Sequence, residues 1–133
     1  AESGEGCYFN GTRIRPTDGP GRASGEGGAR TVCCTDYGDL SRRHPALLSH
    51  VAEAGYTART WADAYGYLLL ATGRVDGMID PVMNAWDIAP MYPIVEEAGG
   101  IITSLSGDRE PLGTSALAAT PALHPTLLRA ARS

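Results

Sequence analysis

The chain is organised around residues 86–100, which read Trp-Asp-Ile-Ala-Pro-Met-Tyr-Pro-Ile-Val-Glu-Glu-Ala-Gly-Gly. Asp87 stands where a helix start needs an acceptor for free backbone N–H groups, and the final glycines can take the left-handed conformation that ends a helix. The stretch therefore predicts one helix, with a kink caused by Pro93, which lacks a backbone donor and crowds a carbonyl of the preceding turn. A strand over residues 101–103 should follow. The helix carries one apolar stripe, formed by Ile88, Met91, Ile94, Val95 and Ala98.

Asp87 has two interpretations from spacing alone. As an N-cap, its carboxylate would accept hydrogen bonds from the first backbone N–H groups of the helix. As a functional group, it would be aimed at a metal ion or phosphate site, where the positive end of a helix gathers anions. The spacing is the same in both cases and does not choose between them.

A resemblance to a known family bears on this choice. Trp86-Asp87-x-Ala89 followed by Glu97-Ala98-Gly99-Gly100 resembles the C-terminal signature of the inositol monophosphatase superfamily. Members of this superfamily are magnesium-dependent, lithium-sensitive phosphomonoesterases. The resemblance implies that Asp87 is a metal ligand and that the cofactor is Mg²⁺, and it assigns this role to no other residue of the motif.

The rest of the chain alternates between strand and helix patterns. Such alternation predicts an α/β fold, with one sheet and helices on both of its faces. The resemblance implies more specifically the C-terminal half of the layered αβαβα sandwich of the inositol monophosphatases. The predicted elements are a hairpin over 1–15 around Asn-Gly, a loop over 16–30, strands at 31–35, 56–60, 75–79 and 115–119, and helices at 39–54, 61–73 and 122–131.

Three acidic residues fall at strand-to-helix junctions or helix starts: Asp63, Asp80 and Asp87. In an open α/β sheet, junctions at the carboxyl ends of strands face one crevice, where ligands bind. Three carboxylates at one rim repel each other unless a cation or a cationic substrate joins them. The alternative is that they are three unrelated N-caps.

The resemblance also implies a substrate. Residues 59–65, Arg-Thr-Trp-Ala-Asp-Ala-Tyr, are similar to the Arg-x-x-Gly-Asp-x-Tyr run of the histidinol-phosphate phosphatase branch, with Ala62 in place of glycine. The run Asp80-Pro-x-x-Asn-x-Trp-Asp87 resembles that branch as well. Asp63 and Asp80 then correspond to positions that bind the alcohol part of the substrate. Histidinol has an amine and an imidazole that can both be cationic, so two carboxylates suit it better than neutral inositol.

The resemblance covers nearly the whole chain but only the C-terminal half of the family's length. The metal motifs Glu-Glu and Asp-Pro-x-Asp-Gly-Thr would lie before Ala1, and the absence of an initial Met suggests a preceding segment. We therefore expect residues 1–133 to be the C-terminal α/β portion of a phosphatase, without the N-terminal metal-binding half. No catalytic residue is expected in this chain, which should be inactive alone. Its expected partners are an N-terminal-half chain or a second copy.

The predicted function is thus a part in the hydrolysis of histidinol phosphate, a step of histidine biosynthesis. Two alternatives remain open. One is an enzyme acting on inositol-1-phosphate or another sugar phosphate. The other is a truncated, non-catalytic relative that binds a partner subunit.

Composition bears on the partners and the location of the protein. The chain has 133 residues, a net charge of −4, and 11 basic residues that are all arginine and form no basic patch, which argues against a nucleic-acid partner. No apolar run approaches the roughly 20 residues of a membrane span, and the N-terminus does not resemble a signal peptide. Cys7, Cys33 and Cys34 are expected to be buried thiols in a reducing compartment, so the predicted location is cytoplasmic. The histidines, His44, His50 and His124, are expected on the surface or beside helices.

Overall fold

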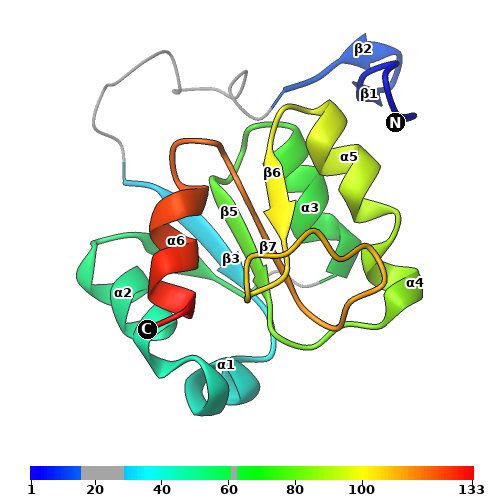
Figure 1. Cartoon of the computed structure of the whole chain (residues 1–133). Helices are drawn as coiled ribbons and strands as arrows, with labels where there is room; N and C mark the ends of the chain where they lie inside the picture. Colours follow the sequence, from blue (N-terminus) through cyan, green and yellow to red (C-terminus); the bar gives the residue numbers. More distant parts are fainter. Residues whose placement is uncertain (16–28, 61–62) are drawn as a thin grey trace.

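The computed structural model describes residues 1–15, 29–60 and 63–133, and its centre is a five-stranded sheet (Figure 1). The strand order is β4-β3-β5-β7-β6. β3 pairs in parallel with both β4 and β5, whereas β7 runs antiparallel to β5 and β6. This mixed sheet confirms the predicted α/β class. The strands are β3 (Thr31–Cys34), β4 (Thr57–Arg59), β5 (Gly77–Asp80), β6 (Ile101–Thr103) and β7 (Ala116–Ala119).

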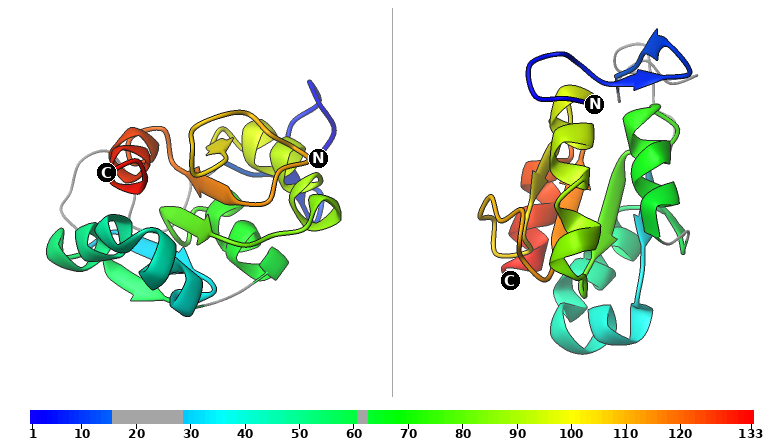
Figure 2. Two further views of the ribbon diagram at one scale, coloured as in Figure 1. Left: turned by 60° about the horizontal axis from the view of Figure 1, so that its bottom comes forward. Right: turned by 90° about the vertical axis from the view of Figure 1, so that its right-hand side faces the viewer.

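Helices cover both faces of the sheet, as predicted (Figures 1 and 2). Neighbouring strand residues point to opposite faces, so Met78 packs on the α3–α5 side and Ile79 on the α1–α2–α6 side. None of the helices in the described ranges is long and apolar enough to cross a membrane. One face carries α1 (Tyr37–Arg43), α2 (Pro45–Glu53) and α6 (His124–Ala131), and the other carries α3 (Asp63–Ala71), α4 (Ala85–Ile88) and α5 (Met91–Glu97).

The predicted helix after residue 86 is in fact two helices, α4 and α5, separated at Ala89 and Pro90. The predicted effect of Pro93 is the physical reason: its ring crowds the carbonyl of Ala89, so the helix restarts at residue 91. The N-cap interpretation of Asp87 is wrong, because the N-cap is Asn84 and Asp87 is the third residue of α4. Its carboxylate is therefore available for another role.

Other element boundaries also differ from the prediction. The helix expected over 39–54 is α1 and α2, separated by His44, because the residue before Pro45 is driven out of the helical conformation. Asp80, expected in a loop, is the last residue of β5. The loop predicted over 16–30 lies outside the described residues except for its last two positions, and so do residues 61–62 of the next predicted helix.

The predicted N-terminal hairpin is confirmed. Its strands are β1 (Tyr8–Phe9) and β2 (Thr12–Arg13), paired in antiparallel fashion. Asn10 and Gly11 between them both have positive φ, 50° and 79°, as a two-residue hairpin turn of type I′ requires.

The carboxylate of Glu97, at the end of α5, holds the segment before this hairpin. Gly4 N donates to one oxygen at 2.6 Å and Gly6 N to the other at 2.8 Å. These two N–H groups lower the pKa of Glu97. Beside them, Cys7 packs in a small cluster with Ala71 and Ala98. The hairpin is therefore attached to the C-terminal ends of α3 and α5.

All three cysteines are free and buried, which confirms their predicted burial. Burial raises the pKa of Cys33 to about 11 and that of Cys34 to about 12. Both thiols therefore stay protonated at neutral pH and are poor nucleophiles.

The prediction for His124 is wrong. Its side chain is only 4% exposed, and its Nε2 lies 3.0 Å from Thr103 Oγ1 on β6. The first turn of α6 lies directly on the sheet, so a residue at the helix start becomes part of the interior. His44 and His50 are half-buried on the α1–α2 side.

The burial of His124 predicts an acid-sensitive fold. Burial lowers the pKa of His124 below its ordinary value of 6.5. As pH falls below 6.5, the unfolded chain takes up this proton before the folded chain does, so the free energy of unfolding should decrease until the folded-state pKa is passed. Urea unfolding between pH 7 and pH 5 measures this loss. In His124→Gln the decrease should be smaller, and equal decreases in both proteins would contradict the prediction.

Candidate functional site

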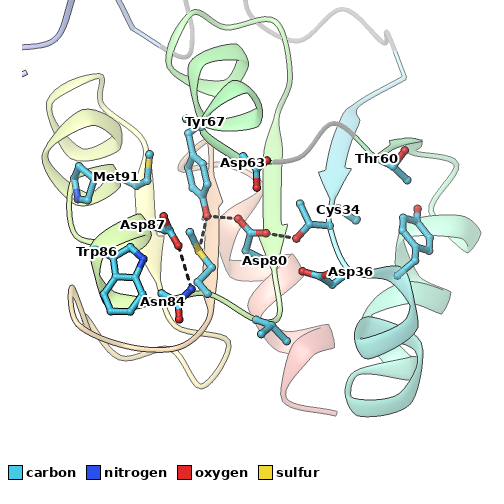
Figure 3. Close-up of a pocket in the computed structure, with 16 residues that line it drawn as sticks. Cys34, Asp36, Thr60, Asp63, Tyr67, Asp80, Asn84, Trp86, Asp87 and Met91 are labelled. Atoms are coloured by element: carbon cyan, nitrogen blue, oxygen red, sulfur yellow. Dashed lines mark hydrogen bonds between the residues drawn. The ribbon is translucent and has the colours of Figure 1, made fainter.

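A pocket of about 630 Å³ opens at the carboxyl ends of β3 and β5 (Figure 3). Its walls come from the β3–α1 junction, the start of α3, the end of β5, and α4 with the start of α5. Among the described residues that line it there is no Arg, Lys or His. Four carboxylates line it instead: Asp36, Asp63, Asp80 and Asp87.

Asp80 is the buried member of this group, with 4% of its surface exposed. The Thr35 hydroxyl donates to its Oδ1, and the Tyr67 hydroxyl donates to its Oδ2 at 2.9 Å. Burial raises the pKa of Asp80 above its ordinary value, the two hydroxyl donors oppose that rise, and the charges of Asp36 and Asp63 add to it. The structure therefore brings Asp63 and Asp80 into one electrostatic group, as predicted from their place at the strand ends.

Asp36 and Asp63 share an uncommon backbone conformation. Their φ angles are 44° and 58°, and the only other non-glycine residue with positive φ in the described ranges is Asn10 in the hairpin turn. Aspartate tolerates this region better than most residues, and such conformations cluster at functional sites. Both side chains are exposed and border the pocket.

Asp36 was missed by the sequence reasoning. It follows β3 directly, just beyond the carboxyl end of a buried strand. The rule that selected Asp63 and Asp80, an acid at a strand-to-helix junction, would have selected Asp36 as well. Asp36 therefore carries the same sequence signal as the two acids that were predicted.

Asp87 lies on another wall of the pocket, beside Trp86 (Figure 3). It is exposed, and Asn84 Nδ2 donates a long hydrogen bond to its Oδ2, at 3.4 Å. A carboxylate with a free oxygen fits Mg²⁺, which prefers oxygen ligands, but an octahedral site needs several of them. Within the parts of the chain that the structure describes, no three His, Cys, Asp or Glu side chains are grouped so as to hold a metal ion. Asp87 can thus serve as one ligand of a set completed elsewhere.

The wall around Asp87 is apolar. Trp86 is 76% exposed and Val82 is 45% exposed, and both line the pocket together with Met91. The pocket therefore combines an apolar wall with an acidic one. Such a lining can bind an organic molecule with an apolar body and a positive charge.

Comparison with known proteins shows first the class of fold. The structure matches the IMPase from Thermotoga maritima with a TM-score of 0.79 and 27% sequence identity, over 99% of this chain and 50% of that protein. The family model "Inositol monophosphatase family" matches residues 1–133. The chain belongs to the inositol monophosphatase family.

Two curated relatives of the chain have different names. A "Histidinol-phosphatase" from Chlorobaculum parvum is 38% identical over 103 residues, which are 75% of this chain and 37% of that protein. A "Fructose-1,6-bisphosphatase/inositol-1-monophosphatase" from Aquifex aeolicus is 31% identical over 135 residues, covering 97% of this chain and 48% of that protein. The chain thus spans between about a third and a half of the length of these relatives.

Proposed function

We propose that this chain is the C-terminal portion of a magnesium-dependent phosphomonoesterase that hydrolyses histidinol phosphate. The observation that carries the proposal is the pocket, which is lined by four carboxylates and by apolar side chains, with no basic side chain among the described lining residues. Such a pocket suits the cationic alcohol of the substrate. It repels the phosphate unless other positive charges are added.

Magnesium ions would supply these charges, neutralising the phosphate and activating the attacking water. The role of Asp87 is to hold metal at the phosphate end of the pocket. The remaining ligands come from outside the described residues, because no group of three candidate ligands exists within them. An N-terminal-half chain, or a second copy of this chain, is the proposed source.

Asp63 and Asp80 are the proposed binding groups for the alcohol. Asp63 is exposed at the pocket border and can contact an ammonium or imidazolium group directly. Asp80 lies deeper and acts through its charge and its remaining acceptor positions. A hydrogen bond to a charged group contributes roughly 1.5–3 kcal/mol, which corresponds to about ten- to a hundredfold in selectivity.

Each of the two alternative functions is supported by one observation. The Aquifex relative carries a name for sugar-phosphate chemistry, and carboxylates can also accept hydrogen bonds from the hydroxyl groups of inositol. A non-catalytic relative is consistent with the incomplete metal site in the described residues. The first alternative predicts a preference for neutral alcohols, and the second predicts no hydrolysis in any assembly.

The substrate proposal predicts a selectivity that depends on Asp63. In the complete enzyme, the specificity constant for histidinol phosphate should exceed that for inositol-1-phosphate, and Asp63→Asn should reduce the ratio by about tenfold or more because a charged hydrogen bond is lost. Steady-state kinetics with both substrates measure this ratio. Asp108→Asn, which changes an exposed carboxylate that does not line the pocket, is the matched control. A preference for inositol-1-phosphate in the unmodified enzyme would refute the proposal.

A further inference from the structure

The buried carboxylate of Asp80 is held by donors from two different elements. Thr35, immediately after β3, donates to Oδ1, and Tyr67, from α3, donates to Oδ2 at 2.9 Å. Tyr67 is 1% exposed and Thr35 is 7% exposed, so neither hydroxyl is a surface group with water as an easy alternative. Figure 3 shows two hydrogen bonds that meet at the carboxylate of Asp80, one of them from Tyr67.

The phenolic proton of Tyr67 has one strong acceptor here. Among the described residues, the second acceptor within reach is Met83 Sδ, at 3.4 Å, and a thioether sulfur is a weak acceptor. The Tyr67 hydroxyl therefore donates this hydrogen bond to the carboxylate while Asp80 is charged. Since an aromatic side chain in a close-packed core cannot easily reorient, the bond also fixes the direction of Oδ2.

The groups around Asp80 disfavour its charge. Asp36 at the β3–α1 junction and Asp63 at the start of α3 are both negative, and Cys34 on β3 is a buried neutral thiol. No basic residue is among the described residues that line the pocket. With burial added, the two hydroxyl donors are what favours the ionised form of Asp80.

We propose that Tyr67 is a positioning residue for substrate recognition: it keeps the buried carboxylate of Asp80 charged and directed at the cationic part of the alcohol. This inference rests on the proposed function for the identity of the alcohol. Thr35 has the same positioning role, because its hydroxyl donates a hydrogen bond to the other oxygen of Asp80. Tyr67 itself does not act on the substrate.

The first experiment measures Asp80 directly and needs neither substrate nor metal. In the full 133-residue chain, the carboxyl ¹³C resonance of Asp80 is followed from pH 3 to pH 9. Tyr67→Phe should raise the pKa of Asp80 above that of the unmodified chain, because the ionised form loses a donor. Tyr92→Phe is the matched control: Tyr92 is equally buried in the same core cluster, but its hydroxyl accepts from Glu110 N instead of contacting Asp80.

The second experiment measures binding of L-histidinol, with myo-inositol as the neutral comparison, by calorimetry across the same pH range. Histidinol affinity should decline on the acid side as Asp80 is protonated. In Tyr67→Phe this decline should begin at higher pH, so that at acid pH the variant binds histidinol about tenfold more weakly, the effect of one hydrogen bond to a charged group. Titration of histidinol itself is the same for every variant and cancels in the comparison with Tyr92→Phe.

Two further variants protect the test against a folding defect. Thr35→Val removes the donor to Oδ1 and should raise the pKa of Asp80 in the same direction, whereas Thr35→Ser keeps the hydroxyl and should leave it near that of the unmodified chain. An unchanged Asp80 titration in Tyr67→Phe and Thr35→Val would overturn the positioning role. A raised pKa together with no preference for histidinol over inositol would support that role and overturn the proposed substrate instead.

Discussion

Asp87→Asn should lower the turnover of the complete phosphatase by at least about a hundredfold, with little change in its fold. The substitution replaces a charged oxygen ligand by a neutral amide, so the metal cluster loses both a ligand and a compensating charge. Even residues that only orient metal ligands typically affect metal affinity or activity about ten- to a hundredfold, and a direct ligand should do no less.

The fold should survive because Asp87 is exposed and the hydrogen bond that it accepts from Asn84 is long. Phosphate release at saturating magnesium measures turnover, and thermal unfolding confirms the fold. Asp108→Asn serves again as the control, since it carries the same chemical change outside the pocket. Full turnover in Asp87→Asn would exclude the metal-ligand role, and the helix-cap alternative is already excluded by the position of Asp87 inside α4.

The isolated chain should release no measurable phosphate and should bind Mg²⁺ no more tightly than an ordinary exposed carboxylate does. The reason is the ligand count: in the ranges that the structure describes, no three suitable side chains are grouped. Stripping water from magnesium is costly, and a single carboxylate offsets little of that cost. Activity should appear only when an N-terminal half supplies the other acids.

Calorimetric titration with Mg²⁺, combined with a phosphate-release assay, tests this prediction. The same assay is then repeated after co-expression with the N-terminal half of a relative from the inositol monophosphatase family. Sedimentation should show that the chain alone self-associates, because Tyr8 and Phe9 of the hairpin are 53% and 39% exposed. Tight magnesium binding and fast hydrolysis by the isolated chain would mean that the metal site has been assigned to the wrong residues.

Local sequence patterns predicted most of the helices and strands, and a kink at Pro93, but not the full separation of α4 from α5 or of α1 from α2. The stripe after residue 86 located α5, and the Asn-Gly pair located the hairpin. The spacing of apolar residues does not reveal a break when the helices on both sides of it bury the same face. For this reason α1 and α2 were predicted as one helix despite Pro45. His124 was misplaced for another reason, since its burial depends on how α6 lies against β6, far away in the sequence.

The site shows the same division between local and distant information. The junction rule predicted that Asp63 and Asp80 would share one crevice, and the structure places both on the same pocket. The environment of Asp80 could not be predicted, because its donors lie 45 and 13 residues away along the chain. Asp36 was not predicted, because it lies outside the motifs on which the resemblance to the family rests.

The position of β7 has a consequence for how this chain folds during synthesis. β7 is the last strand to be made, yet it belongs between β5 and β6 and is the neighbour through which β6 joins the sheet. Until residues 116–119 leave the ribosome, β5 keeps an open edge and β6 has no partner, and open edges invite aggregation. The sheet therefore closes in one late step over long sequence separations, which favours slow folding. A chain that stopped before residue 116 would lack β7, so both β5 and β6 would lose their pairing with it.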